Sequence, residues 1–283
     1  MTTNLTTSLK TQIRNDVKTA LQAIMTYAAV GEGTTAAAAA DTEIELEVFR
    51  DAIDEFDTSV ADTVTASLRI AATEANGNST SEVGWLDAAA LIVDSCDAAD
   101  WTDSADMTTS ANNSEYKSGD ISLNLTKDAG ASATASASKS TTSRDFTSKS
   151  FSMWLYIVDA AALAKLAASS CLTIRFGSDS SNYYQWQKDA ADLAVGWNLV
   201  KGLTSANANS TTGSPVIAAC DYTYVGLTAT GAAITWSAGD FIMDDIKLTS
   251  GTLWTHNIVN TKNKTDDIQL YFDTSIQITI TEA

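Results

Sequence analysis

Two neighbouring segments of the sequence place polar and aromatic residues at the alternating spacing of a β-strand. In LTIRFGS, apolar residues alternate with Arg175, and in NYYQWQK the residues Tyr183, Gln185 and Gln187 share one face. Aromatic rings cover the C–H faces of sugar rings, and planar polar groups hydrogen-bond to hydroxyls. We therefore predict that Arg175, Tyr183, Gln185 and Gln187 form one carbohydrate-binding sheet surface.

A third segment, FSMWLYIV, carries aromatic residues in the same alternating pattern. Trp154 and Tyr156 alternate there with apolar residues, and we predict that both join the carbohydrate-binding surface. The alternative is that the large aromatic residues, namely Trp154, Trp186 and Trp197, fill the core of the domain.

Few residues in the chain point to catalysis. The only histidine is His256, and no G-x-S-x-G pattern provides a nucleophile for it. Acidic residues are numerous, but their spacing singles out no carboxylate pair for glycoside hydrolysis. We predict that the protein is not an enzyme, with a glycan depolymerase as the alternative.

The first 90 residues predict a helix followed by a small antiparallel sheet. Apolar residues recur every three or four positions over residues 4–28, and Gly31 and Gly33 are expected to end this helix. Residues 64–72 and 80–88 alternate like strands, and Asn76-Gly77 between them is a strong hairpin signal.

From residue 91 the sequence consists of short strands separated by turns rich in Ser, Thr and Gly. Seven or more strands within about 160 residues predict a β-sandwich. The expected strands cover residues 121–126, 151–158, 172–178, 182–188, 197–203, 222–229 and 240–249, with part of 131–143 added. After residue 250, two alternating segments around residues 262–267 need a sheet to join, and residues 64–90 offer one.

Several short motifs near the two ends resemble a module of virion proteins of tailed viruses, found at the base of tail fibres and in related appendages. The motifs are Gly31–Thr35, Glu47–Arg50, Asn76-Gly77 with Glu82–Gly84, and Lys264–Asp267. The resemblance implies a discontinuous virion-anchoring base domain, residues 1–90 plus 251–283, interrupted by an insertion. It also implies symmetric homo-oligomers, with a trimer or pentamer expected, and contacts with other virion proteins.

Residues 91–250 resemble the jelly-roll carbohydrate-binding modules. The matching pieces are DSCDAADW, KSGDISLNL, FSMWLYI, GSDSSNYYQW, GWNLV and FIMDDIKL. The expected fold class is therefore mainly β with an N-terminal α-helix, in which a small α+β base domain is interrupted by a jelly-roll β-sandwich. The resemblance implies that the inserted domain binds host surface glycans.

The jelly-roll resemblance also implies a structural calcium ion. The matching positions are Asp94, Asp120 and Asp244, and calcium prefers such oxygen ligands. Of the two adjacent aspartates, only Asp244 shares the face of Ile242 and Ile246, which favours it over Asp245 as a ligand. The alternative is that Asp244 lies in water or bonds to the backbone.

Charge and cysteine content restrict the partners further. A net charge of −18, spread along the chain, makes nucleic-acid binding unfavourable. We expect no signal peptide and no membrane insertion, and hence a protein made in the host cytoplasm and located in the virion.

The predicted function is a tail-fibre or baseplate protein that attaches to host glycans. Alternatives are a capsid decoration or turret protein and a host adhesin.

The chain has three cysteines, at positions 96, 171 and 220. We expect Cys96, Cys171 and Cys220 to be buried thiols, although one disulfide is an alternative.

Overall fold

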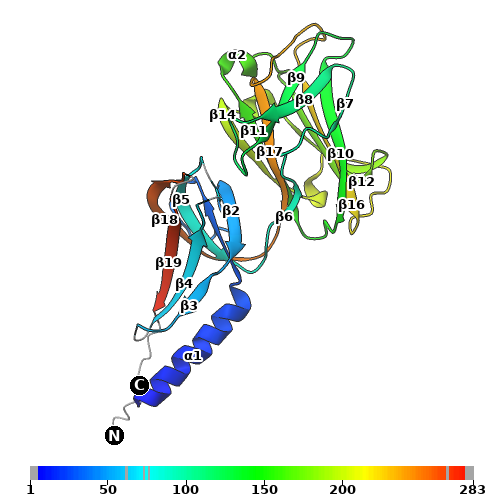
Figure 1. The fold of residues 1–283 in the computed structure, drawn as a ribbon. Helices are drawn as coiled ribbons and strands as arrows, with labels where there is room; N and C mark the ends of the chain where they lie inside the picture. The colour runs from blue at the N-terminus through cyan, green and yellow to red at the C-terminus, as the bar shows by residue number, and fades with distance from the viewer. Residues whose placement is uncertain (1–5, 61–62, 73, 76, 266–267, 278–283) are drawn as a thin grey trace. The chain divides into compact units, whose positions relative to one another are not determined.

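The computed structural model describes residues 6–60, 63–72, 74–75, 77–265 and 268–277, and they confirm a mainly β fold with an N-terminal helix (Figure 1). The chain divides into two compact units, one of residues 1–89 with 251–283 and one of residues 90–250. The sequence predicts the first boundary one residue later, after residue 90, and the second at the same place, after residue 250. No helix among the described residues is long and apolar enough to span a membrane.

The first unit, the base unit, consists of one helix and two small sheets. In the described residues, a four-stranded sheet has the order β18-β5-β1-β2 and a three-stranded sheet has the order β19-β4-β3. The elements are α1 (Thr7–Ile24), β1 (Tyr27–Gly31), β2 (Glu47–Ala52), β3 (Glu55–Asp57), β4 (Thr63–Ile70), β5 (Ser79–Leu86), β18 (Leu253–Asn263) and β19 (Leu270–Gln277). The indole nitrogen of Trp85 links the sheets by donating to Oγ1 of Thr274 at 2.6 Å.

The helix is shorter than its sequence pattern predicts. It begins after Thr6, whose Oγ1 accepts a hydrogen bond from the Leu9 amide at 3.3 Å, and it ends at Ile24 instead of continuing to residue 28. Residues Tyr27–Gly31 form strand β1 because they pair with both β2 and β5. The expectation that Gly31 and Gly33 end the helix is therefore wrong.

The predicted hairpin between residues 64–72 and 80–88 is also wrong. The two strands form, but β4 lies in one sheet and β5 in the other, while Asn76 lies outside the described residues. The C-terminal piece provides the missing partners, since β19 pairs with β4 and β18 pairs with β5. The Gly77 amide, between β4 and β5, donates a hydrogen bond to the carbonyl of Lys264, between β18 and β19, at 3.0 Å.

The carboxylate of Glu82 joins both pieces of the base unit. This side chain is fully buried and accepts hydrogen bonds from the amides of Gly33, Glu45 and Leu46 at 2.7–2.9 Å. Its Oε2 also lies 3.1 Å from Nε2 of His256 on β18. A buried carboxylate needs such partners, which explains why this one histidine is structural.

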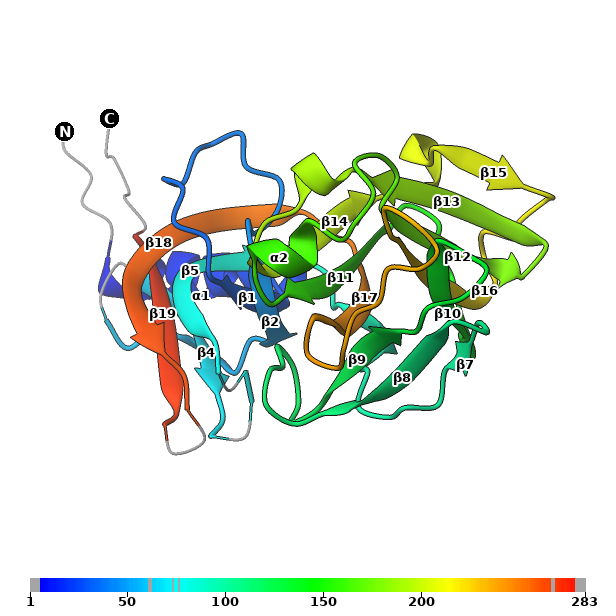
Figure 2. The same cartoon turned by 90° about the horizontal axis from the view of Figure 1, so that it is seen from above.

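The second unit, the sandwich unit, is a jelly-roll β-sandwich of two sheets (Figure 2). Its first sheet has the order β15-β13-β12-β16-β10-β7, and its second has the order β14-β11-β17-β9-β8 with β6 paired to β17. The strands are β6 (Leu91–Asp94), β7 (Thr102–Asp103), β8 (Met107–Asn112), β9 (Ser122–Lys127), β10 (Thr134–Arg144), β11 (Ser150–Ile157), β12 (Leu172–Asp179), β13 (Asn182–Lys188), β14 (Gly196–Leu203), β15 (Ser210–Thr212), β16 (Cys220–Thr228) and β17 (Phe241–Thr249). A short helix, α2 (Ala160–Leu163), follows β11.

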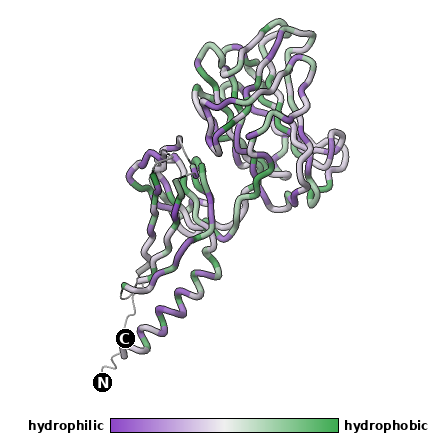
Figure 3. The backbone as a smooth tube through the Cα atoms, in the orientation of Figure 1, coloured by the Kyte–Doolittle hydropathy of each residue, from purple (hydrophilic) through white to green (hydrophobic). Residues whose placement is uncertain are grey.

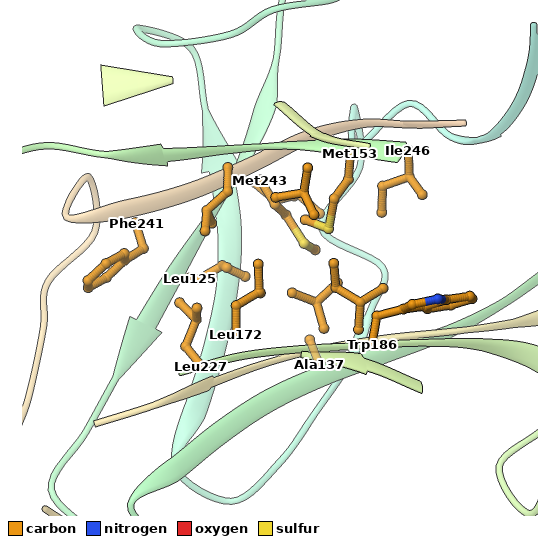
Figure 4. Packing of buried hydrophobic residues seen from close by; sticks show 14 of the residues in the cluster. Leu125, Ala137, Met153, Leu172, Trp186, Leu227, Phe241, Met243 and Ile246 are labelled. Atoms are coloured by element: carbon orange, nitrogen blue, oxygen red, sulfur yellow. The ribbon is translucent and has the colours of Figure 1, made fainter. Parts of the chain in front are cut away.

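The core of the sandwich lies between the two sheets (Figure 4). Leu172 and Trp186 of the first sheet face Met153 and Met243 of the second, and all four are almost fully buried. Burying such side chains stabilises the unit by about 1.5–3 kcal/mol for each large aliphatic residue.

The three cysteines of the sandwich are free and buried. Burial raises the pKa of Cys171 and of Cys220 to about 11, and it raises the pKa of Cys96 well above its usual range. All three therefore act as small apolar residues, as one reading of the sequence predicts.

Candidate functional site

The outward face of the sheet β15-β13-β12-β16-β10-β7 carries continuous cross-strand rows of polar and aromatic residues. Arg175 on β12 lies opposite Gln185 on β13 and Tyr224 on β16, and Tyr224 lies opposite Ser138 on β10. These residues face outward because their neighbours along each strand, such as Ile174 and Val225, point into the core. We call this surface the polar-aromatic face. It consists of Thr102, Ser136, Ser138, Ser140, Thr173, Arg175, Gly177, Tyr183, Gln185, Gln187, Ser210, Thr212, Tyr222, Tyr224 and Gly226.

Arg175 contacts three other residues of this face. Its guanidinium carbon lies 4.6 Å from the ring centroid of Tyr183 and 4.3 Å from that of Tyr224, so two phenol rings contact it. Its Nε donates a hydrogen bond to Oε1 of Gln185 at 2.8 Å. Each cation–π contact contributes about 0.5–1 kcal/mol at an exposed site, so the three neighbours together restrict the arginine side chain to one orientation.

Four of the six predicted sugar-binding residues therefore lie together. The structure places Arg175, Tyr183, Gln185 and Gln187 on the polar-aromatic face, each of them partly exposed. Their role in binding stays a prediction.

Two tyrosines of this face were missed by the sequence analysis. Tyr224 contacts Arg175, and the ring centroid of Tyr222 lies 6.4 Å from that of Tyr183. Burial raises the pKa of Tyr222, so its hydroxyl stays protonated and can donate as well as accept. The alternation in YTYVGL marks both residues as outward-facing. Only strand order, however, brings β16 beside β12, and strand order cannot be read from the segment alone.

Two glycines of the polar-aromatic face leave room for the tyrosines. A Cβ on Gly226 would lie 2.7 Å from the hydroxyl oxygen of Tyr224, so the tyrosine side chain extends over this position. A Cβ on Gly177 would lie 2.2 Å from the carbonyl oxygen of Asn182 and 2.4 Å from Cα of Tyr183. Gly177 therefore has to be glycine for this packing, whereas a side chain at Gly226 would displace the Tyr224 ring.

Trp154 and Tyr156 do not join the polar-aromatic face, which corrects the prediction of one shared surface. Both lie on β11 in the opposite sheet, where alternate residues such as Leu155 point into the core. Trp154 is only 1% exposed and packs under the ammonium group of Lys117, which lies 4.9 Å from its ring centroid. Tyr156 is half-buried beside a shallow groove of about 440 Å³.

The predicted calcium ligands have other partners in this structure. Asp94 is 7% exposed, and its Oδ2 lies 2.5 Å from Nζ of Lys139, which lies equally close to Oδ1 of Asp100. Burial lowers the pKa of Lys139, but the hydrogen bonds to Asp100 and Asp94 outweigh burial and raise it. Asp120 is exposed at the end of a turn.

Asp244 is buried at an irregularity in β17. The register of this strand shifts next to Asp245, whose φ of 47° is left-handed, so that Met243 and Ile246 both face the core. The expectation that Ile242 and Ile246 share a face is therefore wrong. Asp244 accepts hydrogen bonds from the amides of Lys117 at 2.6 Å and Ser118 at 3.0 Å.

These carboxylates do not fit a calcium site as they lie. Calcium takes six to eight oxygen ligands, whereas Asp94 contacts an ammonium group and Asp244 contacts amide donors. In the part of the chain that the structure describes, no group of three His, Cys, Asp or Glu residues is placed to hold a metal ion. Calcium binding by Asp94, Asp120 and Asp244 stays a prediction.

Comparison with known proteins yields similar solved structures only. No family model and no curated protein matches the chain. The family 11 carbohydrate-binding module from Clostridium thermocellum, in complex with a β-1,3-1,4-mixed-linked tetrasaccharide, is 12% identical with a TM-score of 0.41, covering 58% of this chain and 98% of that one. A xylan-binding domain from CBM 22 is 15% identical with a TM-score of 0.30, covering 58% of this chain and 94% of that one. An exo-β-agarase is 10% identical with a TM-score of 0.39, covering 58% of this chain and 25% of that one.

Proposed function

We propose that the sandwich unit binds glycans through the polar-aromatic face. The observation that carries this proposal is the arrangement of Arg175, held between the rings of Tyr183 and Tyr224 and bonded to Gln185. The surface combines phenol rings, amides and a fixed guanidinium group, and its tyrosine, glutamine and arginine residues are partly exposed. Such groups match the C–H faces and hydroxyls of sugar rings.

Binding of the full-length chain to a glycan array tests this proposal. We expect Tyr224→Ala to remove most binding, because it deletes one ring and frees Arg175. Tyr156→Ala is the matched control, since it removes a half-buried tyrosine from the opposite sheet. Unchanged binding by Tyr224→Ala, or a loss caused only by Tyr156→Ala, would refute the assignment of the site.

We infer that this binding occurs without hydrolysis of the glycan. Glycosidases use a pair of carboxylates about 5–10 Å apart on either side of the bond. Among the described residues that define the polar-aromatic face, none is Asp or Glu. Release of reducing sugar from a bound polysaccharide would contradict this inference and favour a depolymerase.

We further propose that the base unit anchors the protein to the particle of a tailed virus, as a tail-fibre or baseplate component. The support is the resemblance of the motifs at Gly31–Thr35 and Glu82–Gly84, which meet where the Glu82 carboxylate binds the Gly33 amide. A capsid decoration or turret protein is the alternative position. Mass spectrometry of purified particles tests location in the virion, and a density map of the particle separates tail from capsid.

Self-association through helix α1 is the third part of the proposal. Hydrophilic and hydrophobic residues alternate along this helix (Figure 3), yet none of its 18 residues is buried. Leu9 is 44% and Ile24 is 37% exposed, whereas Ile13, Val17 and Leu21 are partly buried, so the two ends of the apolar stripe are left uncovered. The helix carries Lys10, Arg14 and Lys18 against one aspartate, whereas the chain as a whole carries −18. An apolar stripe and opposite charge together favour packing against further copies of the chain, in a trimer or pentamer.

A further inference from the structure

We infer that the polar-aromatic face prefers glycans that carry isolated anionic groups, either carboxylates or sulfates, and that Arg175 is the residue that selects them. This inference rests on the proposed glycan-binding function and gives the chemical class of its ligand. It follows from three observations on Arg175 and its surroundings.

The first observation is that Arg175 carries the one formal charge of the polar-aromatic face. Among the described residues of its cross-strand row, which runs from Ser210 through Gln185, Arg175 and Tyr224 to Ser138, every other side chain is neutral. The sandwich unit has 10 basic and 17 acidic residues, so a sheet face with a single positive charge stands apart from the rest of its surface.

The second observation is that the terminal nitrogens of Arg175 lack acceptors. Its Nε donates to Gln185, but within the described part of the chain neither terminal nitrogen has a hydrogen-bond or ion-pair partner. Arg50 shows the contrast, because its guanidinium group forms an ion pair of 2.6 Å with the carboxylate of Glu47. Arg175 therefore keeps its bidentate donor edge available for a ligand.

The third observation is that the guanidinium group is already oriented. The rings of Tyr183 and Tyr224 contact it, and Gln185 fixes Nε, so binding an anion requires little further loss of side-chain freedom. A guanidinium group fixed in this way can donate two parallel hydrogen bonds to two oxygens of a carboxylate or a sulfate. The phenol rings beside it can contact the sugar ring that bears the anionic group.

The surrounding acidity limits the density of charge that the ligand can carry. Net negative charge on the unit repels a polyanion at long range, although salt near 0.15 M screens this repulsion beyond about 8 Å. A glycan with occasional uronate or sulfate groups between neutral sugars therefore fits the site better than a densely sulfated chain. The contact with Arg175 itself is short and is screened less.

Calorimetric titration of the full-length chain with matched pairs of oligosaccharides tests the inference. One arm compares an oligogalacturonate with its fully methyl-esterified form, and the other compares a sulfated galactan oligosaccharide with its desulfated form. Three proteins are compared with each pair. They are the wild type, the variant Arg175→Gln and the variant Arg175→Lys. Arg175→Gln keeps a polar side chain without a charge, and Arg175→Lys keeps the charge without the planar guanidinium group.

We expect the wild type to bind at least one anionic member about tenfold to a hundredfold more tightly than its neutral partner, as expected for a hydrogen bond to a charged group. Arg175→Gln should abolish this preference, leaving the charged and neutral partners with equal, weakened affinity, and Arg175→Lys should restore only part of the preference. The arm that shows the preference identifies carboxylate or sulfate.

Two results would overturn the inference in distinguishable ways. Equal affinity for charged and neutral partners, unchanged in Arg175→Gln, would leave glycan binding intact and refute the anionic preference alone. If none of these oligosaccharides binds and the glycan array is also negative, the proposed function fails, and the inference fails with it.

Discussion

Glu82 and His256 are separated by 174 residues of sequence, yet Oε2 of Glu82 lies 3.1 Å from Nε2 of His256. Nδ1 of the same imidazole lies 2.7 Å from Oδ2 of Asp41, so the histidine bridges two carboxylates. The N-terminal and C-terminal pieces of the base unit are thus joined through one fully buried carboxylate.

The stability of the base unit should depend on this carboxylate. Glu82→Gln removes a charge that three amides and His256 stabilise, and it places an NH₂ group among those donors. We expect a loss of about 3 kcal/mol in the free energy of unfolding. Hydrogen exchange of the β1 amides measures this loss of stability. The control is Glu45→Gln, which changes a partly exposed carboxylate of the same unit. Equal exchange in both variants would contradict the role of Glu82.

The two glycines of the polar-aromatic face should respond differently to alanine. Gly226→Ala meets only the far end of the Tyr224 ring, which can swing aside, so we expect reduced glycan affinity with little change in stability. Gly177→Ala meets the backbone of Asn182 and Tyr183 and should destabilise the sandwich by about 1–3 kcal/mol. Urea unfolding followed by glycan titration separates the two effects. A stable Gly177→Ala variant would show that β12 and β13 are packed less closely.

Asp244 should make the stability of the sandwich depend on pH. Burial raises its pKa from 3.8 to about 7, against the opposing amides of Lys117 and Ser118. At a pH between these two values, the Asp244 carboxyl group keeps its proton in the folded protein and has lost it in the unfolded chain. The free energy of unfolding should therefore fall as the pH rises from about 4 to 7, by at most roughly 1.4 kcal/mol per pH unit.

The variant Asp244→Asn cannot titrate and should lose this slope. Urea unfolding followed by tryptophan fluorescence between pH 4.5 and 7.5 measures the difference, and Asp120→Asn at an exposed aspartate is the control. Parallel pH profiles for the wild type and Asp244→Asn would show that Asp244 is ionised throughout this range.

Calcium should not be needed for the sandwich unit to fold. The ammonium group of Lys139 already contacts the Asp94 carboxylate, so we expect a chelator to leave the melting temperature unchanged. Lys139→Met would leave the Asp94 carboxylate buried without its cation and should cost about 3 kcal/mol. Lys149→Met breaks a surface pair of 3.9 Å and should cost less than about 1 kcal/mol. A fall in melting temperature on chelation, reversed by added calcium, would instead establish the predicted metal site.

Oligomerisation through α1 should depend on the exposed part of its apolar stripe. Replacing Leu9 by Glu places a charge in the interface between copies, and we expect the protein to dissociate into monomers. Gln12→Glu alters an exposed position of the same helix and serves as the control. Light scattering coupled to size-exclusion chromatography measures the mass. A monomeric wild-type protein would contradict the proposed self-association.

Much of the candidate site could be predicted from strand periodicity. Alternation in LTIRFGS and NYYQWQK places Arg175, Tyr183, Gln185 and Gln187 outward, because successive side chains of a strand point to opposite faces. The same rule places Trp154 and Tyr156 on an outward face as well, but it does not predict to which of the two sheets their strand belongs. Alternation also failed at Asp244, where a left-handed residue shifts the register of β17.

The mainly β class, the division into two units and the outward-facing residues of single strands can be read from the sequence, because these depend on local composition and on a period of two. The neighbours of each strand, in contrast, depend on the three-dimensional fold. The fold places Tyr224 beside Arg175 and Trp154 in the opposite sheet, and it pairs the C-terminal strands with β4 and β5 in separate sheets. Strand order depends on contacts between residues far apart in the chain, and no local pattern encodes those contacts.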